Sequence, residues 1–114
     1  MKEQKPYTIF MLVKTTTEWL KMKPKQRFEF LDTDIRPILA KYPSVKMRYF
    51  DSEAYNANFT DILTWETSEL RDYENIIEEL RESLFWGTYF EIVQIIKAVE
   101  DAYADFYKAA PIAG

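Results

Sequence analysis

The chain has 114 residues, of which 47% are hydrophobic and 17% aromatic, enough apolar material for one domain with its own core. Its 15 basic and 19 acidic residues give a formal net charge of -4, and they form no basic stripe of the kind that binds nucleic acid. Cysteine and histidine are absent, which excludes disulfides, thiolate or histidine catalysis and the usual protein ligands of zinc, copper and haem iron.

No apolar run approaches the length of a membrane span, and the first twenty residues lack the small-residue cleavage site of a signal peptide. We therefore expect a cytoplasmic protein with no membrane or nucleic-acid partner, no cofactor and no structural transition metal. Low-complexity segments, linkers and internal repeats are missing too. The expectation is one α+β domain over residues 1–114, with flexible ends at 1–5 and 110–114.

The first predicted element is a strand over residues 7–15 (YTIFMLVKT), which is rich in β-branched and aromatic residues and apolar at both parities. A strand of this kind is covered on both faces of its sheet. The threonines that follow predict a helix cap and a short turn of helix around Trp19.

A longer helix is predicted to open at Pro24, because proline suits the first turn. Its apolar residues recur at spacings of three and four and form one stripe: Phe28, Leu31, Ile35, Ile38 and Leu39. Pro37 falls within this stripe. Since proline lacks an N–H donor and crowds the carbonyl four residues back, we expect it to bend or split the helix.

Two strands follow, over residues 45–50 and 62–66, joined by an irregular hairpin tip. The next helix, over residues 68–82, has the clearest amphipathic pattern in the chain, and Ser68 is its expected cap. Residues 89–98 predict a last strand, again apolar on both faces, and helical spacing resumes from Val99.

The predicted order is therefore strand, helix, strand, strand, helix, strand, helix. This order defines a ferredoxin-like βαββαβ fold with an extra C-terminal helix. Both main helices cover one face of the sheet, yet the first and last strands are apolar on both faces, so something must cover the second face. A second copy would give a dimeric α+β barrel; in a monomer the C-terminal helix would have to act as a lid.

The predicted contact with a second copy uses apolar residues of the second face: Phe10, Leu12, Phe50, Ile92 and Ile96.

Several segments resemble the darcynin family of small bacterial proteins over about residues 7–107. The most specific are RYFDSEAY (48–55) and VEDAYADF (99–106). The family is a domain of unknown function, so the resemblance implies the domain boundaries and offers no catalytic residue. It also implies kinship with dimeric α+β barrels, which bears on fold and only weakly on function.

Candidate site residues come from the strands. Arg48 and Glu66 lie on the mixed faces of the two middle strands, where they could line a ligand cavity or form an inter-strand salt bridge. Trp65 belongs to an aromatic group that could stack on a flat ligand or fill the core. Glu91 and Gln94 have opposite parity on the last strand, so one of them should face each side.

Three acids cluster around the middle hairpin: Asp51, Glu53 and Asp61. Their spacing does not match a calcium-binding loop. The same segment could hold a catalytic carboxylate pair, but a chain with 19 acidic residues would place some of them close together by chance.

Two functions of different classes remain open. The first is a protein that binds or transforms a small organic molecule in a pocket between sheet and helices. The alternative is a non-enzymatic dimeric interaction or accessory module. A cavity of a few hundred cubic ångströms with convergent polar groups would favour the first function.

Overall fold

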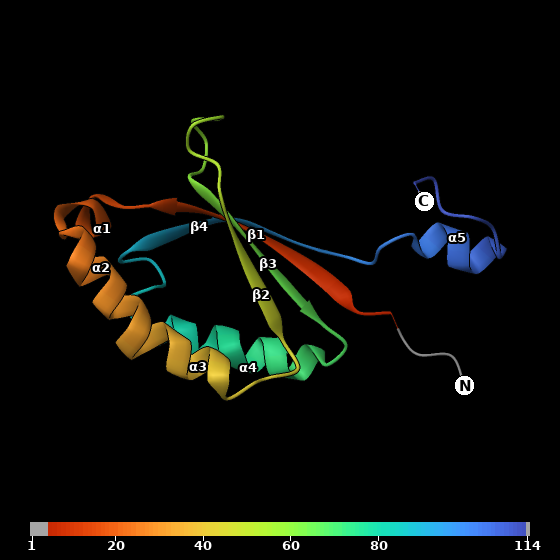
Figure 1. Cartoon of the computed structure of the whole chain (residues 1–114), viewed down its shortest axis with the longest axis horizontal. Helices are drawn as coiled ribbons and strands as arrows, with labels where there is room; N and C mark the ends of the chain where they lie inside the picture. The colour runs from red at the N-terminus through yellow and green to blue at the C-terminus, as the bar shows by residue number, and fades with distance from the viewer. Residues whose placement is uncertain (1–4, 114) are drawn as a thin grey trace.

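The computed structural model describes residues 5–113. It contains one antiparallel sheet with strand order β2-β3-β1-β4, and helices pack against one of its faces (Figure 1). The strands are β1 (Tyr7–Thr15), β2 (Lys46–Asp51), β3 (Asp61–Thr67) and β4 (Phe90–Ala98). The helices are α1 (Thr17–Lys21), α2 (Pro24–Phe30), η1 (Leu31–Ile35), α3 (Arg36–Ala40), α4 (Leu70–Arg81) and α5 (Ala102–Tyr107). The ferredoxin-like α+β fold predicted from the sequence is confirmed.

Alternation along the central strands separates the two faces of the sheet. The buried apolar residues of β1 and β3 all point to the helices and form the centre of the core: Ile9, Met11, Val13, Leu63 and Trp65. Helix α4 adds Ile76 and Leu80 to this core, both of them at most 1% exposed. We call this side the helix face and the opposite side the open face.

The first long helix is interrupted as predicted at Pro37. Residues Leu31–Ile35 are wound as a π-helix, and the N–H of Arg36 donates to the carbonyl of Leu31, five residues back. Pro37 then stands in the first turn of α3, where no intrahelical donor is needed. The wider π turn therefore removes the conflict between proline and a continuous α-helix.

Helix α4 follows the predicted stripe, but its predicted cap is wrong. The N-cap residue is Glu69, which makes no side-chain cap. Instead the Thr67 hydroxyl accepts the Glu69 N–H at 2.8 Å. Thr67 is buried on the helix face of β3, so its hydroxyl fixes the turn into α4 from the sheet.

A β-bulge in β4 changes which side chains share a face. The register of β1 with β4 shifts between Leu12 and Val13, so that Glu91 pairs with Lys14 and Gln94 pairs with Leu12. Residues paired in a ladder lie on the same face. The prediction that Glu91 and Gln94 face opposite sides is therefore wrong, because both are on the open face.

The same bulge corrects one of the residues expected to meet a second copy. Ile92 pairs with Val13 and lies on the helix face, whereas Ile96 pairs with Phe10 and lies on the open face. On the open face Phe10, Phe50 and Ile96 are about two-fifths exposed. Apolar residues thus do occupy this face, as the strand pattern predicts.

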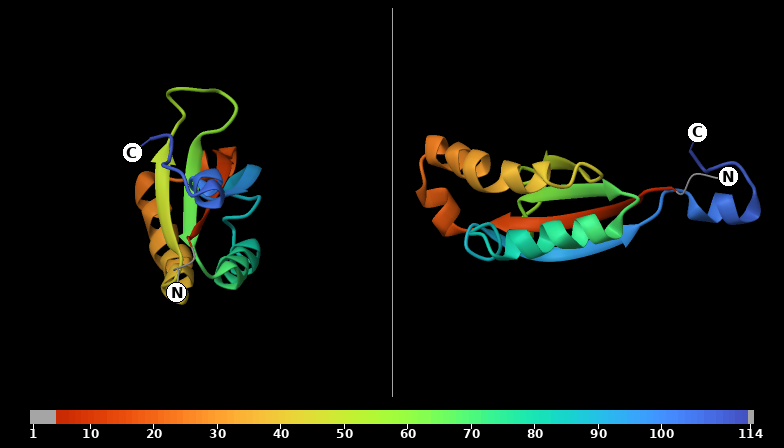
Figure 2. Two further views of the ribbon diagram at one scale, coloured as in Figure 1. Left: turned by 90° about the vertical axis from the view of Figure 1, so that its right-hand side faces the viewer. Right: turned by 90° about the horizontal axis from the view of Figure 1, so that it is seen from below.

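Helix α5 projects beyond the end of the sheet and leaves the open face uncovered (Figures 1 and 2). Its one fully buried residue is Ala104, and Asp105 forms an ion pair with Lys5 at 2.9 Å. The molecule measures 51 × 33 × 19 Å with a radius of gyration of 16.3 Å, against ~13 Å for a compact domain of this length. The alternative in which α5 acts as a lid is therefore wrong. The predicted flexible ends, 1–5 and 110–114, lie partly outside the described residues.

Candidate functional site

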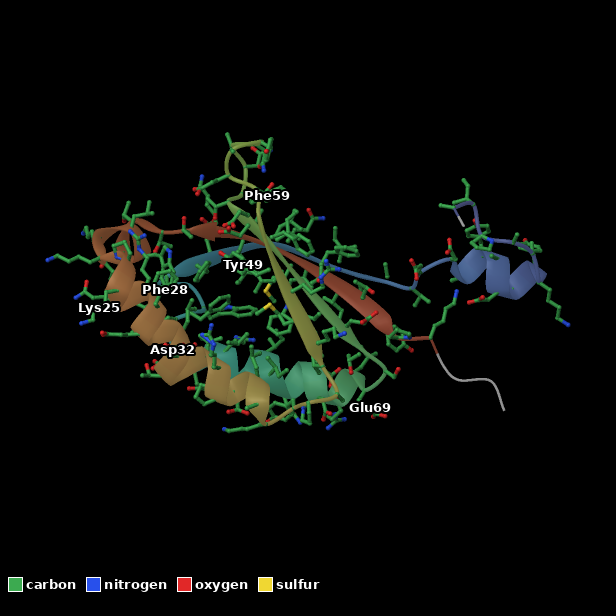
Figure 3. All side chains as sticks on the ribbon, in the orientation of Figure 1. Lys25, Phe28, Asp32, Tyr49, Phe59 and Glu69 are labelled. Atoms are coloured by element: carbon green, nitrogen blue, oxygen red, sulfur yellow. The ribbon has the colours of Figure 1, made fainter. Side chains whose placement is uncertain are left out.

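A cavity of about 500 Å³ lies on the helix face, between the α1–α3 layer and the edge strand β2. Apolar and aromatic side chains make most of its wall: Trp19, Phe28, Leu31, Ile35, Leu39, Met47 and Phe90. Figure 3 shows Phe28 and Tyr49 extending from α2 and β2 into the space between helix and sheet. The volume falls within the range of small-molecule sites. We call it the helix-face cavity.

Helix α1 closes one end of this cavity. Arg27 holds it in place, because its guanidinium donates to the carbonyls of Trp19 and Leu20, each at 3.1 Å. The Trp19 ring packs against Phe90 and Tyr89, with centroid distances of 4.9 and 5.6 Å. These contacts give the cavity an aromatic end wall.

The sheet side of the cavity carries oxygen-bearing side chains. Tyr49 and Asp51 line it from β2, and Asp61 of β3 pairs directly with Asp51 in the ladder. Asp61 is only 4% exposed and accepts a hydrogen bond from the Thr60 hydroxyl at 2.7 Å. Two carboxyl groups and a phenol therefore lie close together on one face of the hairpin.

Burial determines how these groups ionise. Desolvation raises the pKa of Asp61, although hydrogen bonds from Thr60 and Tyr49 partly oppose it. Burial, followed by the negative charge of Asp61 and a hydrogen bond to it, raises the pKa of the Tyr49 phenol far above its usual range. The Tyr49 phenol therefore stays protonated beside Asp61.

The helix side of the cavity carries two cations, Arg27 and Arg36. Arg27 uses part of its guanidinium to anchor α1, as described above. Arg36 pairs with Asp32 one turn earlier at 2.6 Å, and both side chains are about two-thirds exposed. An ion pair this exposed is weak, so Arg36 remains able to bind another anion.

The predicted pair Arg48 and Glu66 lies on the open face, away from this cavity. The two residues are not directly opposed, since Arg48 pairs with Thr64 and Glu66 with Lys46. Both line a groove of about 560 Å³, together with Phe10, Phe50 and Glu100 among others. The Arg48 guanidinium stacks over the Phe50 ring at 4.9 Å.

The remaining predicted residues divide between the two faces. Glu91 and Gln94 are exposed on the open face, near the far edge of the sheet. Trp65 lies in the core at 1% exposure, and its indole N–H has no hydrogen-bond partner among the described residues. The structure thus places four of the five candidates on one face and Trp65 on the other.

The main residues of the helix-face cavity were not among the sequence candidates: Trp19, Arg27, Phe28, Arg36 and Tyr49. A usable signal was present for Tyr49, which has the parity of Asp51 on the same strand and therefore shares its face. No comparable signal exists for the arginines, because helical charges point to solvent in most amphipathic helices.

Within residues 5–113, no group of three or more acidic side chains is arranged to hold a metal ion. In the same part of the chain, no helix combines the length and apolarity needed to cross a bilayer.

Fold and site together define a ferredoxin-like α+β protein with a ligand-sized cavity under its first helices. The profile of the darcynin family, a domain of unknown function, matches residues 2–114. The chain belongs to this family. A darcynin homolog of Granulibacter bethesdensis is 45% identical over 101 residues, covering 88% of this chain and 82% of the relative. One from Streptomyces avermitilis is 39% identical over 109 residues, covering 95% and 90%.

Solved structures of the same fold include chlorite dismutases. A mutant enzyme of Candidatus Nitrospira defluvii superposes with a TM-score of 0.77 at 17% identity, covering 95% of this chain and 45% of that one. A dimeric chlorite dismutase of Nitrobacter winogradskyi gives 0.71 at 15% identity, covering 88% and 61%. The chain spans less than two thirds of these proteins, and at such identity the likeness shows the fold alone.

Proposed function

We propose that this protein binds a small organic molecule in the helix-face cavity. The observation that carries the proposal is a cavity of about 500 Å³ whose wall is mostly apolar but includes Arg27, Arg36, Tyr49 and Asp51. Small-molecule sites combine these two features, since apolar walls supply affinity and a few polar groups fix orientation.

A neutral hydrophobic probe tests the proposal without depending on charge. We expect N-phenyl-1-naphthylamine to bind saturably, with a rise in its fluorescence. Phe28→Lys should weaken this binding, because it removes an aromatic ring from the apolar wall. Phe28 is 65% exposed, so its replacement should leave the fold intact.

Phe106→Lys is the matched control. Phe106 is 79% exposed on α5, outside the cavity, so this variant should bind the probe as the parent does. Absence of saturable binding, or equal binding by both lysine variants, would refute the cavity as a ligand site.

A second candidate, an interaction module that forms a homodimer, is favoured by the open face. Apolar side chains remain exposed there, and cations and anions line the same groove: Lys46 and Arg48 on β2, Glu66 on β3 and Glu100 after β4. We propose a second copy of this chain as the occupant of that face.

Charge complementarity supports this occupant. If a two-fold axis runs parallel to the strands, β2 of one copy lies over β4 of the other. Residues at the same level along the strands then face each other. Lys46, Glu66, Thr8 and Ala98 lie at one level of the sheet, and Glu100 follows two residues after Ala98. Lys46 would then approach Glu100 of the second copy while the apolar centres meet, which is an isologous contact.

Neighbouring isoleucines of β4 provide a matched test of the dimer. Ile95 and Ile96 are 44% and 43% exposed, but they face the helix face and the open face respectively. Sedimentation equilibrium at micromolar concentration should give a dimer for the parent and for Ile95→Lys. Ile96→Lys should give the 13.7 kDa monomer, because it would bury an unpaired charge.

A monomeric parent, or equal behaviour of the two variants, would contradict the dimer. A cytoplasmic location stays a prediction from the sequence.

A further inference from the structure

The polar groups of the helix-face cavity differ in kind between its two sides. This difference restricts the ligand further than volume alone, provided that the proposed function holds. One side of the cavity offers hydrogen-bond donors with positive charge, and the other offers acceptors.

The donor side consists of Arg27 and Arg36. A guanidinium only donates, and it matches the geometry of a carboxylate. Arg27 gives Nε and one terminal nitrogen to the carbonyls of α1, which leaves its other terminal nitrogen available. Arg36 gives one nitrogen to the exposed carboxylate of Asp32. A ligand carboxylate can therefore bind here, in competition with Asp32.

The acceptor side consists of Tyr49 and Asp51. A phenol oxygen can accept a hydrogen bond, and Tyr49 lies on the same face of the hairpin as the carboxyl groups of Asp51 and Asp61. A carboxylate at Asp51 also accepts. A ligand group on this side must accordingly carry an O–H or N–H.

The space between the two sides is apolar and partly aromatic. Phe28, Leu31 and Met47 line it, and Trp19 and Phe90 close one end. Flat aromatic bodies pack well against such walls.

We propose that the ligand is an aromatic carboxylic acid with a hydroxyl group remote from the acid. The carboxylate lies at Arg36, the ring lies against the apolar wall, and the hydroxyl donates to Tyr49 and Asp51. Hydroxyaryl carboxylates are the chemical class that meets all three conditions.

Three fluorescent naphthalenes separate these conditions: 6-hydroxy-2-naphthoate carries both groups, 2-naphthoate only the acid, and 2-naphthol only the hydroxyl. Calorimetric titration of the full chain should rank the first compound tightest. Each missing group should weaken binding by about fivefold to tenfold, the usual effect of one partly exposed, charge-assisted hydrogen bond.

Variants assign each group to its side of the cavity. Arg36→Gln should weaken both naphthoates about fivefold and leave 2-naphthol unchanged, whereas Asp32→Asn should strengthen both naphthoates by removing the competing carboxylate. Lys25→Gln, on α2 and absent from the cavity wall, removes the same charge and should change nothing. Tyr49→Phe should weaken only the two hydroxyl compounds.

Equal affinity for the three naphthalenes would overturn this inference and leave the proposed function standing. So would equal losses from Arg36→Gln and Lys25→Gln, which would indicate attraction by net charge alone. If none of the three bound while N-phenyl-1-naphthylamine still did, the cavity would be a ligand site of a different class. If that neutral probe failed as well, both proposals would fall.

Discussion

Asp61 is a carboxyl group whose burial should make stability depend on pH. Its folded-state pKa is raised above the ordinary value of 3.8, with desolvation as the main cause. The folded state therefore binds the proton more tightly than the unfolded state does. The contribution of Asp61 to stability is fully present below the unfolded pKa and is lost as the pH rises through the folded pKa.

Asp61→Asn removes this titration. We expect the difference in unfolding free energy between parent and variant to shift in favour of the parent as the pH falls from neutral toward 3.8. Urea unfolding across that interval measures it. Glu78→Gln, which removes one carboxyl group at an exposed position of α4, is the reference variant. A difference that is flat with pH, or that grows with rising pH, would contradict the raised pKa.

At the residue scale the sequence predicted part of the site. The hairpin acids Asp51 and Asp61 were visible as a cluster, and period-two alternation places Tyr49 on the same face as Asp51. Arg27 and Arg36 were not predictable, because their role depends on how the layer α1–α3 leans over β2. For Trp65 the sequence left a ligand contact and a core position both open; the structure places it in the core, where its ring packs against Tyr73 of α4.

At the element scale, the sequence predicted that Pro37 interrupts the first long helix, and the structure shows this interruption as a π turn over Leu31–Ile35. A π turn is equivalent to one extra residue in an α-helix, and it rotates the residues after it relative to those before it. Here it keeps the buried Phe30 of α2 and Ile38 of α3 on the side of the core.

A deletion tests this equivalence. Removing the exposed Thr33 should convert η1 to α-helix and bring Pro37 into a regular hydrogen-bond ladder, at a cost of ~3 kcal/mol. Combining the deletion with Pro37→Ala should recover most of that loss, since alanine supplies the missing N–H. Urea unfolding of the two single variants and the double variant measures the coupling. Additive losses would mean that proline and π turn are independent.

The bulge in β4 is an element that the sequence did not reveal. Residues 90–98 are apolar at both parities, so an inserted residue leaves no break in the hydrophobic pattern. The pairing of β4 with β1 sets the register, and the register decides which face Glu91, Ile92 and Gln94 occupy. Strand existence was therefore predictable here, and side-chain direction was not.

At the scale of the whole molecule the strand pattern predicted an apolar second face, and the structure leaves that face open. The position of α5 could not be predicted, because its aromatic spacing fits either a lid or an arm. In the structure it is an arm, with Phe106 and Tyr107 about three-quarters exposed. None of its residues belongs to the main core cluster of the described chain.

Removal of residues 101–114 should therefore cost the isolated subunit little stability. The truncated chain loses the Lys5–Asp105 ion pair, whose partners are 40% and 55% exposed, and such pairs contribute about 0–1 kcal/mol. We expect its unfolding free energy, measured by urea at the lowest workable concentration, to lie within ~1 kcal/mol of the parent.

At higher concentration the two chains should diverge if the arm packs on a second copy. Burial of exposed aromatic side chains stabilises an assembly by mass action, so the unfolding midpoint of the parent should rise with concentration. That of the truncated chain should rise less. A loss of several kcal/mol at low concentration would instead show that α5 stabilises its own subunit. Its aromatic residues would then have to pack against the same chain, in an arrangement different from the extended arm.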